Sequence, residues 1–221
     1  MKFFEYDSPI MSFFSKVFDL VCLNMLALIF SIPLITIGAA MTATHYTALK
    51  LHRNEGNVWK SFFKSFRENL RQSTIIWLII ILCGAVSVVT YNVGIHISGM
   101  YATVLRGVVL TMLILTVLLY AWVIPLQAKF INPISATFKN AIYLAFKHLF
   151  RALLMVVLSI LPVGTFVLIV YVTGMRGMGV WLTCGISVPV YLCAVIYNKV
   201  FEGLEEMIKE KENSDYETFR N

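Results

Sequence analysis

The fold is decided by residues 74–97, TIIWLIIILCGAVSVVTYNVGIHI, a stretch that contains no Asp, Glu, Lys or Arg. A helix that crosses a membrane needs about 20 mostly apolar residues, because each residue rises about 1.5 Å and the hydrocarbon layer is about 30 Å thick. Three further stretches meet this requirement, namely residues 107–128, 152–172 and 178–198. These four segments predict four membrane-spanning helices.

The composition of the whole chain agrees with a membrane protein. The 221 residues are 59% hydrophobic and 14% charged, whereas a soluble domain has about 45–50% apolar and about 25% charged residues. The four cysteines lie inside apolar runs and have neither the close CxxC pairs of a zinc site nor the density of a disulfide framework. This excess of apolar surface cannot be buried in one water-soluble core.

The first apolar stretch, residues 17–49, is too long for a single straight span, since it would extend about 50 Å as a helix. Pro33 and Gly38 indicate a kink or a tight turn within it. One interpretation is a span over residues 17–40 whose continuation emerges as a cytoplasmic helix. The other is a helical hairpin with two short arms. We favour the kinked span, because the second arm is too polar to face lipid.

The sequence therefore predicts an all-α fold, a polytopic transmembrane helical bundle of about five spans. The expected membrane domain covers residues 1–200, and residues 201–221 form a polar tail. The expected spans are residues 17–40, 74–97, 107–128, 152–172 and 178–198.

Basic residues predict the orientation of the spans. Six Lys or Arg residues lie within 50–71 and four within 129–151, whereas the alternate connections hold one each, Arg106 and Arg176. Cytoplasmic loops of membrane proteins are enriched in Lys and Arg. We therefore expect a multi-pass protein of the cell membrane with both long connections and the C-terminus in the cytoplasm.

The long cytoplasmic connections are predicted to be amphipathic helices. In residues 59–71, apolar residues recur with helical spacing and a basic stripe runs beside them. This pattern suits a helix at the anionic inner leaflet or a helix that binds a partner, and it equally suits a helix that packs on its own protein. The residues that would make the external contact are Trp59, Lys60, Phe63, Lys64, Arg67 and Arg71. Apolar positions 134, 138, 142, 146 and 149 predict a similar helix in the second connection.

The chemistry of a catalytic site is missing from the sequence. No Asp or Glu occurs from residue 69 through residue 201, which leaves no paired carboxylates there for acid–base catalysis, metal binding or proton coupling. The histidines lack metal-binding spacing, and no nucleotide or phosphate-loop motif is present. We expect no enzyme activity, no cofactor, no metal site and no nucleic-acid partner.

A few polar residues remain as candidates for a binding cavity. Hydroxyl groups and an imidazole cluster just after Pro33, and an Asn and a His lie one helical turn apart in the second span. Hydrogen bonding between helices is the commoner role for such groups. A solute cavity is the alternative, and it would be lined by Thr42, His45, Tyr46, Asn92 and His96.

Three neighbouring stretches carry a family resemblance: PLITIGAAMTA from Pro33, YTALK from Tyr46 and FFKSFRENLRQSTIIWL from Phe62. Together they resemble the YesL-like family, which consists of bacterial integral membrane proteins built on domain of unknown function 624. The usual family form has a second proline soon after the glycine, where this chain has Ala39 and Ala40. Members tend to accompany carbohydrate-uptake systems of Gram-positive bacteria. The resemblance therefore implies an accessory role in sugar uptake.

Three functions follow as hypotheses. The first is a non-enzymatic accessory or regulatory component of carbohydrate uptake, whose basic helices contact lipid or a transporter complex. The second is a small-solute (sugar) permease, and the third is the permease subunit of an ATP-driven importer. We favour the first, since residues 107–198 supply few polar groups for a sugar path, and the coupling motif expected of the third is not found.

Overall fold

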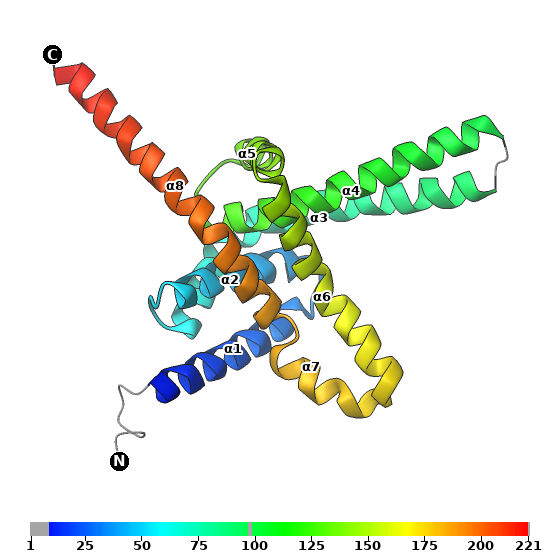
Figure 1. Cartoon of the computed structure of the whole chain (residues 1–221), viewed down its shortest axis with the longest axis horizontal. Coiled ribbons are helices and arrows are strands. Elements are labelled where there is room, and N and C mark those ends of the chain that lie inside the picture. Colours follow the sequence, from blue (N-terminus) through cyan, green and yellow to red (C-terminus); the bar gives the residue numbers. More distant parts are fainter. Residues whose placement is uncertain (1–8, 97–98, 221) are drawn as a thin grey trace.

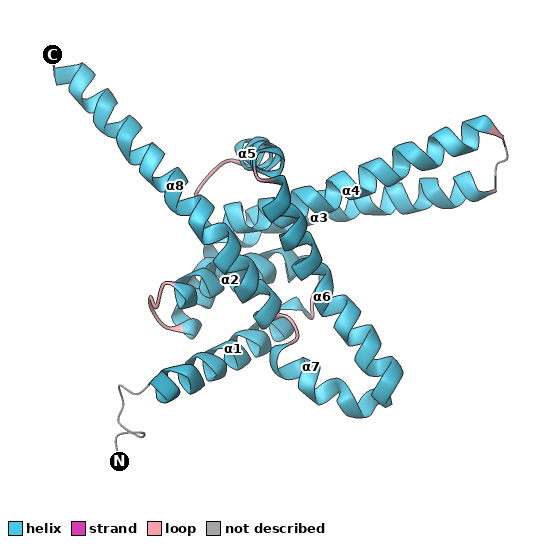
Figure 2. Cartoon of the chain, in the orientation of Figure 1, coloured by secondary structure: helices cyan, strands magenta, loops and turns pink. Residues whose placement is uncertain are grey.

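The computed structural model describes residues 9–96 and 99–220, and every regular element in that part of the chain is helical (Figures 1 and 2). The all-α fold class is confirmed. The α-helices are α1 (Pro9–Ser31), α2 (Ile37–His52), α3 (Val58–Ile95), α4 (Met100–Lys129), α5 (Ile134–Lys147), α6 (Leu149–Thr173), α7 (Met178–Cys184) and α8 (Ser187–Arg220).

Helix α2 lies at the centre of the molecule, and the longer helices extend away from it (Figure 1). Most residues of α2 are buried, and it packs against α1, α3, α4 and α8. The α3–α4 hairpin and the α6–α7 pair project outward with many large apolar side chains exposed, such as Leu82 and Val163. These projecting arms have the surface expected of helices that face lipid.

Four stretches in the described part of the chain are long and apolar enough to cross a membrane: Ile10–Ser31, Val58–Ile95, Met100–Lys129 and Leu149–Glu210. The last of these contains both α6 and the apolar start of α8, with α7 between them. The chain is therefore a bundle of about five spans, as predicted.

The first apolar stretch does not continue as one kinked helix. Helix α1 ends at Ser31, and Pro33 has an extended backbone (φ −74°, ψ 116°). A 3₁₀ turn, Leu34–Thr36, then starts α2, which runs back toward the side where α1 begins (Figure 1). The first span thus ends nearer residue 31 than residue 40, and the hairpin describes this region better than the kinked span that we favoured. The polarity of α2 is tolerated because the helix is surrounded by protein and not by lipid.

Helix α3 joins a predicted connector to a predicted span. It has 38 residues, about 57 Å at about 1.5 Å per residue, which is nearly twice the hydrocarbon thickness. Asn57 caps its start, since its side-chain oxygen accepts hydrogen bonds from the backbone N–H groups of Trp59 and Lys60. The basic segment, residues 59–71, is therefore a rigid extension of the span and not a separate helix.

The last predicted span is interrupted. Within residues 178–198, α7 ends at Cys184 and α8 begins at Ser187. Helix α8 then continues to Arg220 and runs without a break through residue 200, where the sequence suggested that the polar tail begins.

Candidate functional site

A polar pocket of about 490 Å³ lies where the first half of α3 meets the end of α4. Helix α2 contributes one ring, from Tyr46, and the connection after α4 contributes Phe130 and Ile131. The other lining residues are Lys64, Ser65, Glu68, Asn69, Gln72, Gln127, Ala128 and Lys129. Charged, amide and aromatic side chains thus converge on one cavity.

The wall of this pocket is a hydrogen-bonded chain of side chains from three helices. Gln127 Nε2 donates to Asn69 Oδ1 at 3.0 Å, and Asn69 Nδ2 donates to the carbonyl oxygen of Ser65 at 3.0 Å. Thr137 on α5 donates its hydroxyl to Gln127 Oε1 at 3.4 Å. Gln127 and Thr137 are buried. A satisfied network of this kind holds its amide groups in fixed orientations.

An ion-pair cluster ties α8 to the rim of the pocket. Lys129 Nζ lies 2.5 Å from Glu205 Oε1, and Arg53 Nη2 lies 3.7 Å from Glu205 Oε2. Arg53 Nε also donates to Asn198 Oδ1 at 2.8 Å. The polar part of α8 is therefore fixed against both the end of α2 and the end of α4.

The arrangement is suited to binding a polar group. Amide groups and ammonium groups can hold hydroxyl or anionic oxygens, and an aromatic ring can cover an apolar face of a ligand. Glu68 is the one carboxylate that lines the pocket. Among the residues that the structure describes, no group of three or more His, Cys, Asp or Glu side chains could hold a metal ion.

Residues 20–91 match the family model described as "Protein of unknown function, DUF624". This part of the chain is similar to the DUF624 family. The match runs from the middle of α1 through α2 and along α3 as far as Tyr91, so it contains the α3 wall of the pocket but not Gln127 or Lys129. Comparisons with curated proteins and with solved structures found no match.

The five residues predicted to line one cavity do not lie together. Tyr46 lines the polar pocket, whereas Thr42 and His45 are buried on α2. Asn92 and His96 lie toward the far end of α3, about 30 Å along the helix from Gln72, and both are exposed. The side chain of Asn92 donates to the carbonyl oxygen of Val88 in its own helix. A single cavity cannot include all five residues.

His45 is a core residue rather than a pocket residue. Its backbone carbonyl accepts a hydrogen bond from the hydroxyl of Tyr197 on α8 at 2.9 Å, and the two rings lie 5.9 Å apart. Thr42 donates to the carbonyl oxygen of Gly38 one turn earlier. His45 thus connects α2 to α8, whereas Thr42 forms a hydrogen bond within α2.

The predicted contact surface at the start of α3 is partly packed on α1 and partly exposed. Phe62, Phe63 and Phe66 all pack on the ring of Phe30 from α1, with ring centres 5.5, 5.4 and 4.9 Å from it. Trp59 and Phe63 are exposed and stacked on each other. The basic residues beside them are also exposed, namely Lys60, Lys64, Arg67 and Arg71. Packing on α1 of the same chain therefore accounts for part of the aromatic stripe, and an external contact by its exposed residues stays a prediction.

Sequence reasoning missed the amide residues of the pocket. Asn69 and Gln72 lie beside the basic stripe and read as ordinary solvated residues. Gln127 gave the clearest signal, because it is an isolated amide near the end of an apolar span, where a polar side chain requires a partner. The identity of that partner, Asn69, could not be read from the sequence.

Proposed function

We propose that this protein is a member of the DUF624 family and a non-enzymatic membrane component that assists carbohydrate uptake as an accessory or regulatory subunit. The family resemblance supports the link to carbohydrate uptake, and the polar pocket supplies a place where a small polar ligand or a partner side chain can bind. The exposed basic and aromatic residues at the start of α3 supply a contact surface at the same end of the molecule.

The observation that carries this proposal concerns the polar side chains of the spanning helices. Away from the pocket, many of these groups donate to carbonyl oxygens of their own helix and are not directed into a shared channel: Ser87, Thr90, Asn92, Thr111, Thr116, Ser159 and Thr165. A sugar path would require hydroxyl-binding groups along the whole membrane thickness. This pattern favours a protein that assists transport over one that carries the solute.

A permease remains the second candidate, because the pocket itself combines amide groups with the rings of Tyr46 and Phe130. Such a mixture is what a sugar site needs. As a permease, the protein would have to extend this pocket through the bundle by moving α4 relative to α3, since these helices contribute most of its lining.

The orientation is part of the proposal. With the basic connections in the cytoplasm, the pocket, α5 and the polar part of α8 face the cell interior. We expect single cysteines at Glu55 and Asn140 to be protected from an impermeant thiol reagent in intact cells, and cysteines at Met100 and Met175 to react. All four positions are exposed, so protection would reflect the membrane and not burial.

This labelling experiment requires a background without Cys22, Cys83, Cys184 and Cys193. Permeabilised cells are the control, and all four positions should then react. Labelling of Glu55 or Asn140 from outside intact cells would show that the orientation is inverted.

If the protein assists uptake without carrying the solute, the purified protein should not transport sugar, but its loss should still impair growth of the native cell. Purified protein in liposomes should move no sugar under any proton gradient, because no carboxylate lies between residues 69 and 201 to couple the two fluxes. Deletion in the native cell should weaken growth on a complex carbohydrate. Replacing Lys60, Lys64, Arg67 and Arg71 with Gln should reproduce that defect.

A variant with four other exposed lysines replaced by Gln, at Lys16, Lys139, Lys199 and Lys209, is the matched control and should grow normally. Both variants must insert at wild-type levels, as measured in membrane fractions. Saturable sugar transport by the reconstituted protein alone would reject the accessory role and establish the permease. Tyr46, Asn69 and Gln127, which line the polar pocket, would then be the first residues to substitute.

A further inference from the structure

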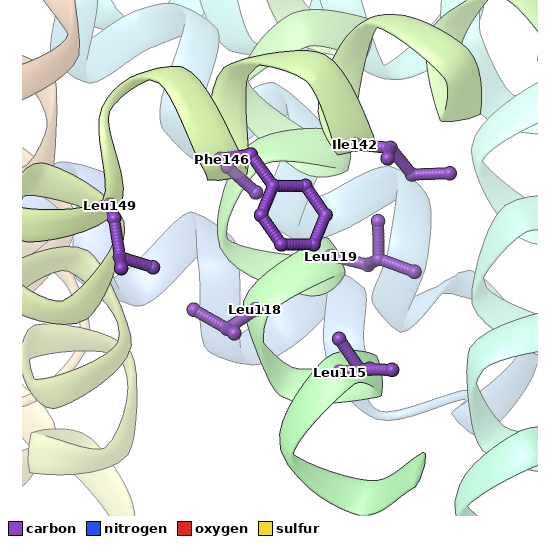
Figure 3. A pocket seen from close by; sticks show the side chains of 7 residues that line it. Leu115, Leu118, Leu119, Ile142, Phe146 and Leu149 are labelled. Carbon is purple, nitrogen blue, oxygen red and sulfur yellow. The ribbon is translucent and has the colours of Figure 1, made fainter. Parts of the chain in front are cut away.

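A second cavity, distinct from the polar pocket, is an apolar groove of about 200 Å³ between α4, α5 and the start of α6. Figure 3 shows leucine side chains of α4 facing Ile142 and Phe146 of α5. All of the lining residues are apolar, namely Leu115, Leu118, Leu119, Ile142, Ala145, Phe146 and Leu149. The groove therefore offers no hydrogen bond to a ligand and would favour a hydrocarbon chain.

The groove is open to the outside of the bundle. Phe146 is 69% exposed, and Leu115, Ile142 and Leu149 are also exposed. Its walls come from α4, which is long and apolar enough to span the membrane, and from α5, the short helix that connects α4 to α6. It therefore lies where the apolar part of the bundle meets its basic end.

Two cations follow the lining residues of α5 and α6 closely in the sequence. Lys147 follows Phe146 directly and lies over the ring of Tyr143, 5.3 Å from its centre. Arg151 lies two residues beyond Leu149. Partial burial, followed by the charges of Arg151 and Lys147, lowers the pKa of His148. Both cations are thus close to the same imidazole.

These cations lack a carboxylate partner within the described residues. Both ion pairs there are made by Glu205, with Arg53 and Lys129. The sequence between residues 69 and 201 contains no Asp or Glu. An unneutralised basic pair beside an apolar groove is complementary to a molecule with an anionic head and a hydrocarbon chain.

We propose that this groove is a binding site for an anionic phospholipid, with one acyl chain on the α4–α5 surface and the headgroup phosphate held by Lys147 and Arg151. The site is independent of any role in uptake. It differs from general attraction to the membrane surface, because it requires both the groove and the cation pair.

Native mass spectrometry of the full-length protein tests the site, with phosphatidylglycerol and phosphatidylcholine of identical chains added in equal amounts. The wild-type protein should retain phosphatidylglycerol preferentially, by roughly fivefold for each cation near the headgroup. The double variant Lys147→Gln/Arg151→Gln should lose most of that preference. The double variant Lys16→Gln/Lys199→Gln, which removes the same charge at two other exposed positions, should keep it.

The groove itself is tested with both cations present. Ile142→Gln should reduce retention of phosphatidylglycerol, whereas Leu82→Gln, at an exposed apolar position of α3, should not. Glycerol phosphate, which has the anionic group without the chains, should not bind. Three results would each overturn the proposal. The wild-type protein could retain both lipids equally, the Lys147/Arg151 variant could keep the wild-type preference, or the wild-type protein could form dimers that exclude lipid. The last result would mean that a second copy of the chain covers the groove.

Discussion

Gly38→Ala is expected to lower the thermal stability of the detergent-solubilised protein sharply, by about 1–3 kcal/mol or more, because the added methyl group has no space. A Cβ atom at Gly38 would lie 2.5 Å from the carbonyl oxygen of Ser73 and 2.5 Å from Cβ of Trp77. Both obstacles are close to the backbone of α3, so neither can move away as a flexible side chain would. The central helix α2 would have to separate from α3.

The matched control is Gly84→Ala, also in a helix. No atom lies within 4 Å of a Cβ at Gly84. Alanine has the higher helix propensity by about 1 kcal/mol, so this substitution should leave stability unchanged or raise it slightly. Opposite signs for the two substitutions are the expected result in a thermal-shift assay monitored by size-exclusion chromatography. Equal stability of both variants would show that α2 and α3 are not in close contact at Gly38.

Asn24→Leu is expected to destabilise the protein by several kcal/mol, since the cost is about 1–3 kcal/mol for each buried polar group left without a partner. Asn24 is fully buried on α1. Its Nδ2 donates to the carbonyl oxygen of Leu182 at 2.6 Å, and its Oδ1 accepts from the backbone N–H groups of Ile186 and Ser187 at 2.8 and 2.9 Å. One side chain thus stabilises the break between α7 and α8.

A second substitution at this position separates the donor function of the Asn24 amide from its acceptor function, and a substitution at Asn92 is the control. Asn24→Asp retains an acceptor for the two N–H groups but loses the donor to Leu182, so its stability should lie between that of the wild type and that of Asn24→Leu. Asn92→Leu removes an exposed amide with one bond in its own helix and should change stability by less than about 0.5 kcal/mol.

Hydrogen exchange gives a local measurement beside the thermal shift. Backbone amides at residues 182–190 should exchange faster in Asn24→Leu than in the wild type, because the start of α8 loses its cap. Unchanged exchange there, with wild-type stability, would contradict the role assigned to Asn24.

The sequence alone determined the features that depend on local hydropathy and charge. Stretches such as residues 74–97 and 107–128 must leave water because of their length and apolar content, and the structure places α3 and α4 over them. Pro33 likewise indicated a break, since it has no N–H to donate and disfavours a helical residue before it. The family match over residues 20–91 agrees with the resemblance seen around Pro33.

Only the tertiary structure decided which polar groups meet. Gln127 and Asn69 lie 58 positions apart, and Asn24 and Ser187 lie 163 positions apart, so no local pattern can pair them. The polarity of α2 was misjudged for the same reason: hydropathy showed that it should not face lipid, but not that neighbouring helices would enclose it. Hydropathy is a property of each segment, whereas a polar pocket or an interhelical cap depends on which segments the packing brings together.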